Sequence, residues 1–197
     1  MNNSSIITGF LCGLLSSIIV SFVWYKLLVP HIKFTNKICR YKSTSKDDVY
    51  TYKIKFRNIG KRSIFELKLY CVLYLQNLKS QNYIHTVYLN LSYDFKPVFK
   101  SRGKKAVNPD GLVRICLNDT NTRNEFIRPL YSAEIQYKAF SGKLTIEDLL
   151  KINDNAYIIF YIIGFDAFSG SKRLFESKKY TIDDIHIGKY KKCELFI

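Results

Sequence analysis

The segment IITGFLCGLLSSIIVSFVWY, residues 6–25, contains no charged side chain. It is about twenty residues long, which matches the length that a helix needs to cross a hydrocarbon core of roughly 30 Å. Trp24 lies near its end and Lys26 follows, an order typical of a membrane–water boundary. Pro30 then ends the helix or begins its exit. The segment therefore predicts a transmembrane helix within residues 1–30.

A secretory signal peptide is the main alternative for this segment. Such peptides begin with positive charge and have a shorter apolar core. Residues 1–5 carry no charged side chain, and the apolar core is longer than a signal peptide needs. A retained membrane anchor is therefore the favoured interpretation.

The distribution of charge predicts how the chain is oriented in the cell membrane. No basic residue precedes the helix, whereas several follow it closely: Lys26, Lys33, Lys37, Arg40 and Lys42. Because positively charged flanks stay in the cytosol, we expect a single-pass protein with its N-terminus outside and its main domain cytoplasmic. Anionic lipid attracts each juxtamembrane Lys or Arg by about 1 kcal/mol. These residues are therefore candidate contacts to anionic membrane lipids.

Small residues recur every four positions along the helix. They are Ser5, Gly9, Gly13, Ser17 and Ser21. Such a stripe lets two helix backbones approach closely in lipid, where no hydrophobic force drives helices together. The alternative is that Gly and Ser are simply common in membrane helices. The regular spacing favours helix association, and with it a homo-oligomer.

The residues after the anchor are strongly basic. We assign residues 31–45 to a basic juxtamembrane linker, whose sequence is also compatible with a first short strand. Residues 46–197 are assigned to one cytosolic domain, which is long enough to have its own core. All of the formal net charge of +15 lies after residue 25, since the first 25 residues are uncharged. That balance suits anionic partners, and lipid comes first because the anchor already holds the domain at a membrane. A protein partner in the membrane or cytosol is also compatible, whereas nucleic acid or a nucleotide is the least favoured partner.

Short strands separated by turn residues dominate the domain. Residues 50–57 alternate apolar and polar side chains, which is typical of a strand with one buried face. We expect further strands over residues 63–75, 83–93, 111–118, 156–165 and 172–180, and a last edge strand over 190–197. Ser132 and Thr145 are positioned to cap one or two short helices. The pattern predicts a mainly β fold, an immunoglobulin-like β-sandwich, with a barrel as the alternative.

Residues 94–110 interrupt the strand pattern with proline and glycine and are expected to form a loop. The loop has a cluster of cations, of which four are candidates for binding an anion: Lys100, Arg102, Lys104 and Lys105. The alternative is that this charged run is a solvated loop without a ligand.

No catalytic or metal-binding pattern is present in the sequence. The five cysteines are widely spaced and no C-x-x-C occurs, so neither a zinc site nor a disulfide framework is indicated. There is no P-loop, dinucleotide fingerprint or nucleophile elbow. Interleaved tyrosines and lysines could stack on bases. We expect instead that the strand tyrosines pack in the core: Tyr50, Tyr52, Tyr70, Tyr74 and Tyr88. We therefore expect no enzyme and no cofactor.

Four segments after Arg128 carry a resemblance to a known family. They are Pro129-Leu130-Tyr131, the acidic-leucine stretch 144–150, the strand and turn 164–170, and the closing segment 180–188. Over about residues 128–190 their order resembles the cytoplasmic domain of inward-rectifier potassium channels. The resemblance implies an immunoglobulin-like domain that assembles side by side under a membrane. It does not imply conduction, because those channels need two membrane helices and a Gly-Tyr-Gly filter, which this chain lacks.

Together these features predict a single-pass membrane protein whose cytosolic β domain senses a ligand or partner. A membrane-acting effector that oligomerises through its helix is the first hypothesis for its function. A non-catalytic accessory or scaffold subunit of another membrane protein or channel is the alternative.

Overall fold

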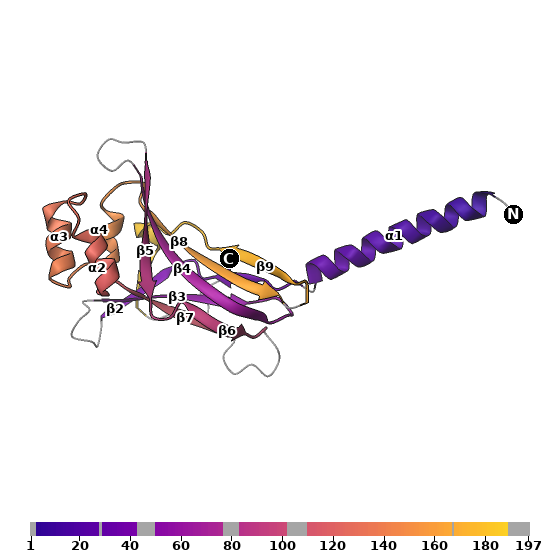
Figure 1. The fold of residues 1–197 in the computed structure, drawn as a ribbon, viewed down its shortest axis with the longest axis horizontal. Helices are drawn as coiled ribbons and strands as arrows, with labels where there is room; N and C mark the ends of the chain where they lie inside the picture. The colour runs from indigo at the N-terminus through magenta and orange to yellow at the C-terminus, as the bar shows by residue number, and fades with distance from the viewer. Residues whose placement is uncertain are drawn as a thin grey trace.

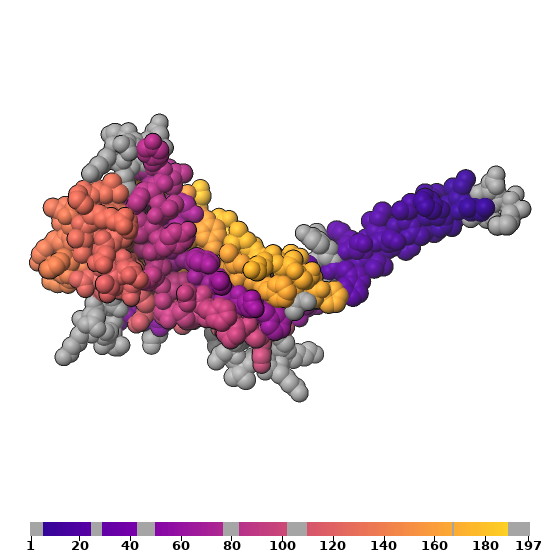
Figure 2. Space-filling view, in the orientation of Figure 1, coloured from indigo at the N-terminus to yellow at the C-terminus, as the bar shows by residue number. Residues whose placement is uncertain are grey.

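The computed structural model describes residues 3–27, 29–42, 50–76, 83–101, 110–166 and 168–188. A long helix, α1 (Asn3–Leu27), projects from one end of a mainly β domain (Figure 1). All side chains of Ile6–Trp24 are exposed, and this stretch is long and apolar enough to cross a membrane. Figure 2 shows the helix as a narrow rod that extends away from the domain. The exposure of so many apolar side chains is expected of a helix whose surroundings are lipid.

Ten strands form the β domain in the described part of the chain. They are β1 (Ile32–Phe34), β2 (Ile38–Lys42), β3 (Tyr50–Asn58), β4 (Ile64–Gln76), β5 (Ile84–Leu91), β6 (Phe95–Phe99), β7 (Asp110–Cys116), β8 (Tyr157–Asp166), β9 (Ser171–Glu176) and β10 (Ile185–Ile187). They belong to a single sheet with the order β10-β2-β3-β7-β5-β4-β8-β9, while β1 pairs with β3 and β6 with β4. All pairings are antiparallel except that of β10 with β2.

Strand β5 joins the two halves of this sheet. Its first part pairs with the end of β4, from Ile84 opposite Gln76 to Leu89 opposite Cys71. Its last residues, Asn90 and Leu91, pair instead with β7. The sheet therefore curls at β5, and one apolar core fills the space inside.

The core contains alternate residues of both halves, such as Phe56 from β3 and Phe99 from β6, whose ring centroids are 5.1 Å apart. The mainly β fold with an N-terminal apolar helix is confirmed. The two separate layers of an immunoglobulin-like sandwich are not, because β5 makes the described strands one continuous curled sheet.

Two parts of the secondary structure differ from the expectation. Residues 31–45 are expected to form a linker with room for one short strand, and they contain two, β1 and β2, which both pair with β3. Their side chains Ile32, Phe34, Ile38 and Cys39 are buried in the core, which explains why this basic segment is ordered. Residues 95–99 were expected to lie in a loop, but they form β6 against β4. The strand expected over 190–197 lies outside the described residues.

Three short helices lie at the end of the domain opposite α1 (Figure 1). They are α2 (Thr120–Phe126), α3 (Ala133–Phe140) and α4 (Ile146–Leu150). The two predicted caps are confirmed: the Ser132 hydroxyl accepts from the Ile135 backbone, and Thr145 forms a capping box with Asp148. Helix α2 was not predicted; Asp119 caps it, and it buries only Thr122 and Phe126.

One carboxylate connects helix α4 to the sheet. Glu147 forms an ion pair of 2.5 Å with Arg40 of β2, and it also accepts a hydrogen bond from the Tyr52 hydroxyl of β3. Burial raises the pKa of Tyr52, and so does this bond to the negatively charged carboxylate, so the phenol stays protonated and donates. Glu147 thus satisfies a hydroxyl that lies inside the domain.

We predict that Glu147→Ala destabilises the domain by about 1–3 kcal/mol, because it leaves the buried Tyr52 hydroxyl without its acceptor and Arg40 without its partner. Glu134→Ala is the matched control, since Glu134 makes an exposed helical ion pair with Lys138 and should contribute less than about 0.5 kcal/mol. Denaturant unfolding of both variants in detergent measures the difference. Equal stabilities would contradict this role of Glu147.

Candidate functional site

The helix meets the β domain through a stack of three side chains. The ring of Trp24, near the end of α1, lies 5.4 Å from the ring of Phe168 with an angle of 14° between their planes. The guanidinium of Arg62 also lies on Phe168, 3.6 Å from the ring centroid. Phe168 comes from the turn between β8 and β9, and Arg62 from the turn between β3 and β4. Residues from three distant parts of the sequence therefore hold the end of the helix.

Residues 29–31, which follow the helix and which we call the exit segment, are hydrogen-bonded to the β3–β4 turn. The backbone N–H of Ile59 donates to the carbonyl oxygen of His31 at 2.8 Å. The buried side chain of Asn58 accepts from the backbone of His31 at 3.4 Å and from that of Gly60 at 3.0 Å, and it donates to the carbonyl of Arg62 at 2.7 Å. Asn58 thus fixes the turn and the exit segment together.

Gly60 allows this close approach. A Cβ atom at this position would lie 2.5 Å from the backbone nitrogen of His31 and 2.8 Å from the Cα of Pro30. Gly60 does not adopt a positive φ, so space is what requires glycine here. The exit segment and the β3–β4 turn therefore pack backbone against backbone.

A buried carboxylate shapes the β8–β9 turn that carries Phe168. Asp166 accepts from the Phe168 backbone at 3.2 Å and from the Ser169 hydroxyl at 2.8 Å. Gly170 has a φ of 64°, which an L-residue adopts only with strain. These contacts set the position of Phe168 beneath Trp24. We use the name junction for three features together: the stack of Trp24, Phe168 and Arg62, the exit segment with Asn58, and the β8–β9 turn.

Two cations near the junction are neutralised within the sheet. Arg57 of β3 forms a two-point ion pair with Asp110 of β7, and Lys55 approaches the same carboxylate at 2.6 Å. Partial burial alone would raise the pKa of Asp110, but the hydrogen bonds from Arg57 and Lys55 lower it overall. Arg57 and Lys55 therefore serve to pair the strands.

The five basic residues expected to contact lipid lie at different distances from the junction. Lys33 lies opposite Arg57, close to the helix exit. Lys37 follows in the turn after β1, and Lys42 pairs with Tyr50 at the other end of β3. Arg40 is occupied by Glu147 near α4, which makes it part of the domain's own packing. The side chain of Lys26 lies outside the described residues.

The other predicted sites are described only in part. Lys100 is exposed at the end of β6, whereas Arg102, Lys104 and Lys105 lie outside the described residues. In α1, Gly9, Gly13, Ser17 and Ser21 are exposed, and the side chain of Ser5 is not described. The Ser17 hydroxyl donates to the carbonyl of Gly13 at 2.9 Å, so it is satisfied within the helix.

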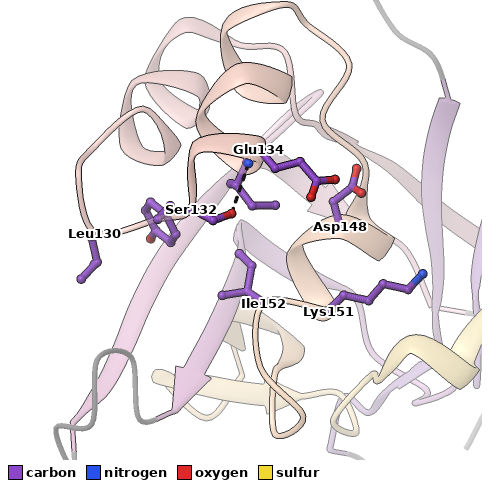
Figure 3. A pocket seen from close by; sticks show the side chains of 8 residues that line it. Leu130, Ser132, Glu134, Asp148, Lys151 and Ile152 are labelled. Atoms are coloured by element: carbon purple, nitrogen blue, oxygen red, sulfur yellow. Dashed lines mark hydrogen bonds between the residues drawn. The ribbon is translucent and has the colours of Figure 1, made fainter.

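A cavity of about 420 Å³ lies between α3 and α4 at the opposite end of the domain (Figure 3). Its size falls within the range of small-molecule sites, roughly 300–1,000 Å³. Apolar side chains of Leu130, Ile135 and Ile152 line it together with Glu134, Asp148 and Lys151. Sequence reasoning missed this cavity because it depends on how two short helices face one another.

The polar groups of the cavity also have structural roles. Figure 3 shows the Ser132 hydroxyl bonded to the backbone at the start of α3. Asp148 accepts from Lys138 at 2.7 Å and from the backbone of Thr145 at 3.1 Å. Burial alone would raise the pKa of Asp148, but the hydrogen bonds from Lys138 and Thr145 lower it. The cavity thus has a binding shape, but none of these contacts resembles a nucleophile beside a base.

Several tyrosines expected in the core lie on the outside of the sheet instead. Tyr52 is buried as predicted, whereas Tyr70 is 37% exposed and Tyr88 67% exposed. The pairing of β5, β4 and β8 places both tyrosines, together with three others, on the outer face of the sheet. Side chains alternate between the two faces along each strand, and these tyrosines occupy the alternate positions that face away from the core. We call this set the tyrosine face: Tyr70, Tyr74, Tyr88, Tyr157 and Tyr161. Tyr74 stacks on Tyr157 with centroids 5.0 Å apart, and its hydroxyl lies 2.8 Å from that of Tyr161.

We predict that Gly60→Ala loosens the junction and lowers stability by about 1–3 kcal/mol, the usual cost of overpacking. Trp24 is the only tryptophan in the chain, so its fluorescence reports on the junction directly. We expect a shifted Trp24 emission in Gly60→Ala and none in Lys61→Ala, which changes an exposed neighbour. Identical spectra and stabilities for Gly60→Ala and the wild type would refute the close approach.

No family model matches the chain, and no curated protein matches it. Among the described residues there is also no group of three or more side chains that could hold a metal ion. The function proposed for this chain therefore rests on the junction, the cavity and the tyrosine face.

Proposed function

We propose that this chain is a single-pass membrane protein whose β domain binds a ligand or partner and transmits that binding to the association of its helix. The helix crosses the membrane with its N-terminus outside, and the domain lies in the cytosol. The charge asymmetry across the helix supports this orientation, because basic residues follow the helix and none precedes it.

The observation that carries the proposal is the junction. Strand β1 begins at Ile32, shortly after α1 ends at Leu27, and Ile32 is already part of the core. Trp24 stacks on a side chain of the domain, and the exit segment is bonded to Asn58. A domain on a flexible tether would be independent of its anchor, whereas this one shares packing with it.

The ligand would bind at the other end of the domain, in the cavity beside α4. Any shift of α4 acts on the sheet through Glu147, which is bonded to Arg40 of β2 and Tyr52 of β3. Strand β3 then runs directly to Asn58 in the junction. The cavity and the helix are thus connected by one strand and its hydrogen bonds, a contiguous arrangement that both sites could bias.

In this proposal the protein acts through association of its helices rather than through catalysis. An added Cβ at Gly13 would meet no atom within 4 Å apart from its chain neighbours and the nearby backbone of its own helix, so the single helix tolerates a larger side chain there. Its effect would fall on a neighbouring helix, since close backbone approach is what small residues permit in lipid. Association of several helices would perturb the membrane or open a path through it.

We predict that overproduction of the protein makes cells leaky to a dye and that Gly13→Leu reduces both the leakage and chemical crosslinking in membranes. Leu15→Ala is the control, because Leu15 lies on the opposite side of the helix from the small residues. Undiminished crosslinking and leakage in Gly13→Leu would rule out helix association as the output.

A second candidate function is an accessory subunit of another membrane protein or channel, and the tyrosine face favours it. Tyrosine is enriched at protein interfaces, and exposed rings beside apolar side chains mark such surfaces. Ile84 and Leu174 are also largely exposed on this side of the sheet. The side-by-side assembly implied by the channel resemblance is part of this proposal as well.

The accessory function predicts a defined partner at the tyrosine face. A photocrosslinking amino acid in place of Tyr88 should give one discrete adduct with another membrane protein in cells. The same amino acid in place of Tyr137, which is equally exposed on α3, should not give that adduct. Absence of an adduct from Tyr88, or the same adduct from both positions, would count against an accessory subunit.

A further inference from the structure

Two turns of the β domain lie beside the end of α1. The β3–β4 turn carries Ile59, which is 39% exposed, and the β8–β9 turn carries Phe168, which is 64% exposed. Lys61 and Lys172 are exposed in and beside these turns. An apolar side chain and a cation thus project from each turn at the same end of the domain.

The depth of these turns follows from the proposed transmembrane helix, on which this inference rests. The apolar stretch Ile6–Trp24 has 19 residues, which at 1.5 Å per residue spans about 28 Å, close to a hydrocarbon core of about 30 Å. Trp24 then lies at the boundary between hydrocarbon and headgroups. Phe168 is stacked on Trp24 and Arg62 on Phe168, so both must lie near the same depth.

The chemistry of the turns suits that depth. The amphipathic ring of Trp24 favours the headgroup region, and an arginine on an aromatic face keeps its N–H groups available for phosphate. Among the described residues, no carboxylate lies within ion-pair distance of Lys61, Arg62 or Lys172, in contrast to Lys55 and Arg57. The three cations of the two turns are therefore not neutralised by a carboxylate of the described part of the domain.

We propose that the β3–β4 and β8–β9 turns lie within the headgroup layer of the membrane. Phe168 and Ile59 contact the upper acyl chains, and Lys61, Arg62 and Lys172 contact lipid phosphates. The β domain is thus docked on the bilayer by its own turns, in addition to being anchored by α1. This surface differs from the basic segment 31–45 expected from the sequence, most of which is built into the sheet.

Tryptophan quenching in reconstituted full-length protein tests the proposal. Trp24 is the only tryptophan, so Phe168→Trp combined with Trp24→Phe moves the single fluorophore to the β8–β9 turn. Vesicles of phosphatidylcholine and phosphatidylserine would contain lipids brominated near the headgroup. We expect these lipids to quench the Phe168→Trp protein several-fold more than a Tyr88→Trp, Trp24→Phe control, whose fluorophore lies on the outer face of the sheet. Equal quenching of the two would overturn the proposal.

The contribution of the cations is measured on the same protein. Adding Lys61→Glu and Lys172→Glu to the Phe168→Trp protein should reduce its quenching in vesicles that contain phosphatidylserine. No reduction would show that the cations do not contact phosphate.

Quenching of Trp24 in the wild-type protein distinguishes this inference from the function on which it rests. If brominated lipids quench Trp24 but not the Phe168→Trp protein, the docked turns are wrong and the span remains. If they do not quench Trp24, the transmembrane helix itself is wrong.

Discussion

The hydrogen bonds of Asn58 are the constraint on which the rest of the structure depends. This one buried amide binds the segment that leaves the helix and also closes the turn between β3 and β4. Strand β3 lies between β2 and β7 in the sheet and pairs with β1 as well. Because Asn58 ends this strand, the position of the helix is set by a strand that is paired with three others. A buried amide with its partners satisfied tolerates little displacement.

The strand pattern and the helix caps could be predicted from the sequence because both are local signals. Alternation over residues 50–57 and the spacing of Thr145 and Asp148 depend only on neighbours in the chain. Segment 31–45 was predicted to be a basic linker with at most one short strand because its lysines and arginine dominate the sequence there. The buried side chains Ile32, Phe34 and Ile38 alternate with them, and that signal was present but short.

The site could not be predicted in the same way, because it joins residues that are far apart in the chain. Nothing near Trp24 in the sequence indicates Phe168 or Arg62, which reach it only once the sheet has curled. The tyrosines show the same limit. Alternation assigned Tyr70 and Tyr88 to one face of a strand, but it could not say which face the core would occupy. Apolar residues on both faces, such as Ile159 of β8, made that choice ambiguous.

The orientation of Trp24 has a consequence for how two helices can cross. Trp24 follows Gly13 by eleven residues and Ser17 by seven, so all three positions lie within about 20° of one direction around the helix. That direction, at the end of the helix, is occupied by the protein's own Phe168. A neighbouring helix that packs on the glycines must therefore diverge as it nears the β domain. Two copies would contact each other near their N-terminal ends and separate toward the β8–β9 turns. The pair of helices would then be V-shaped, with the two β domains holding their C-terminal ends apart.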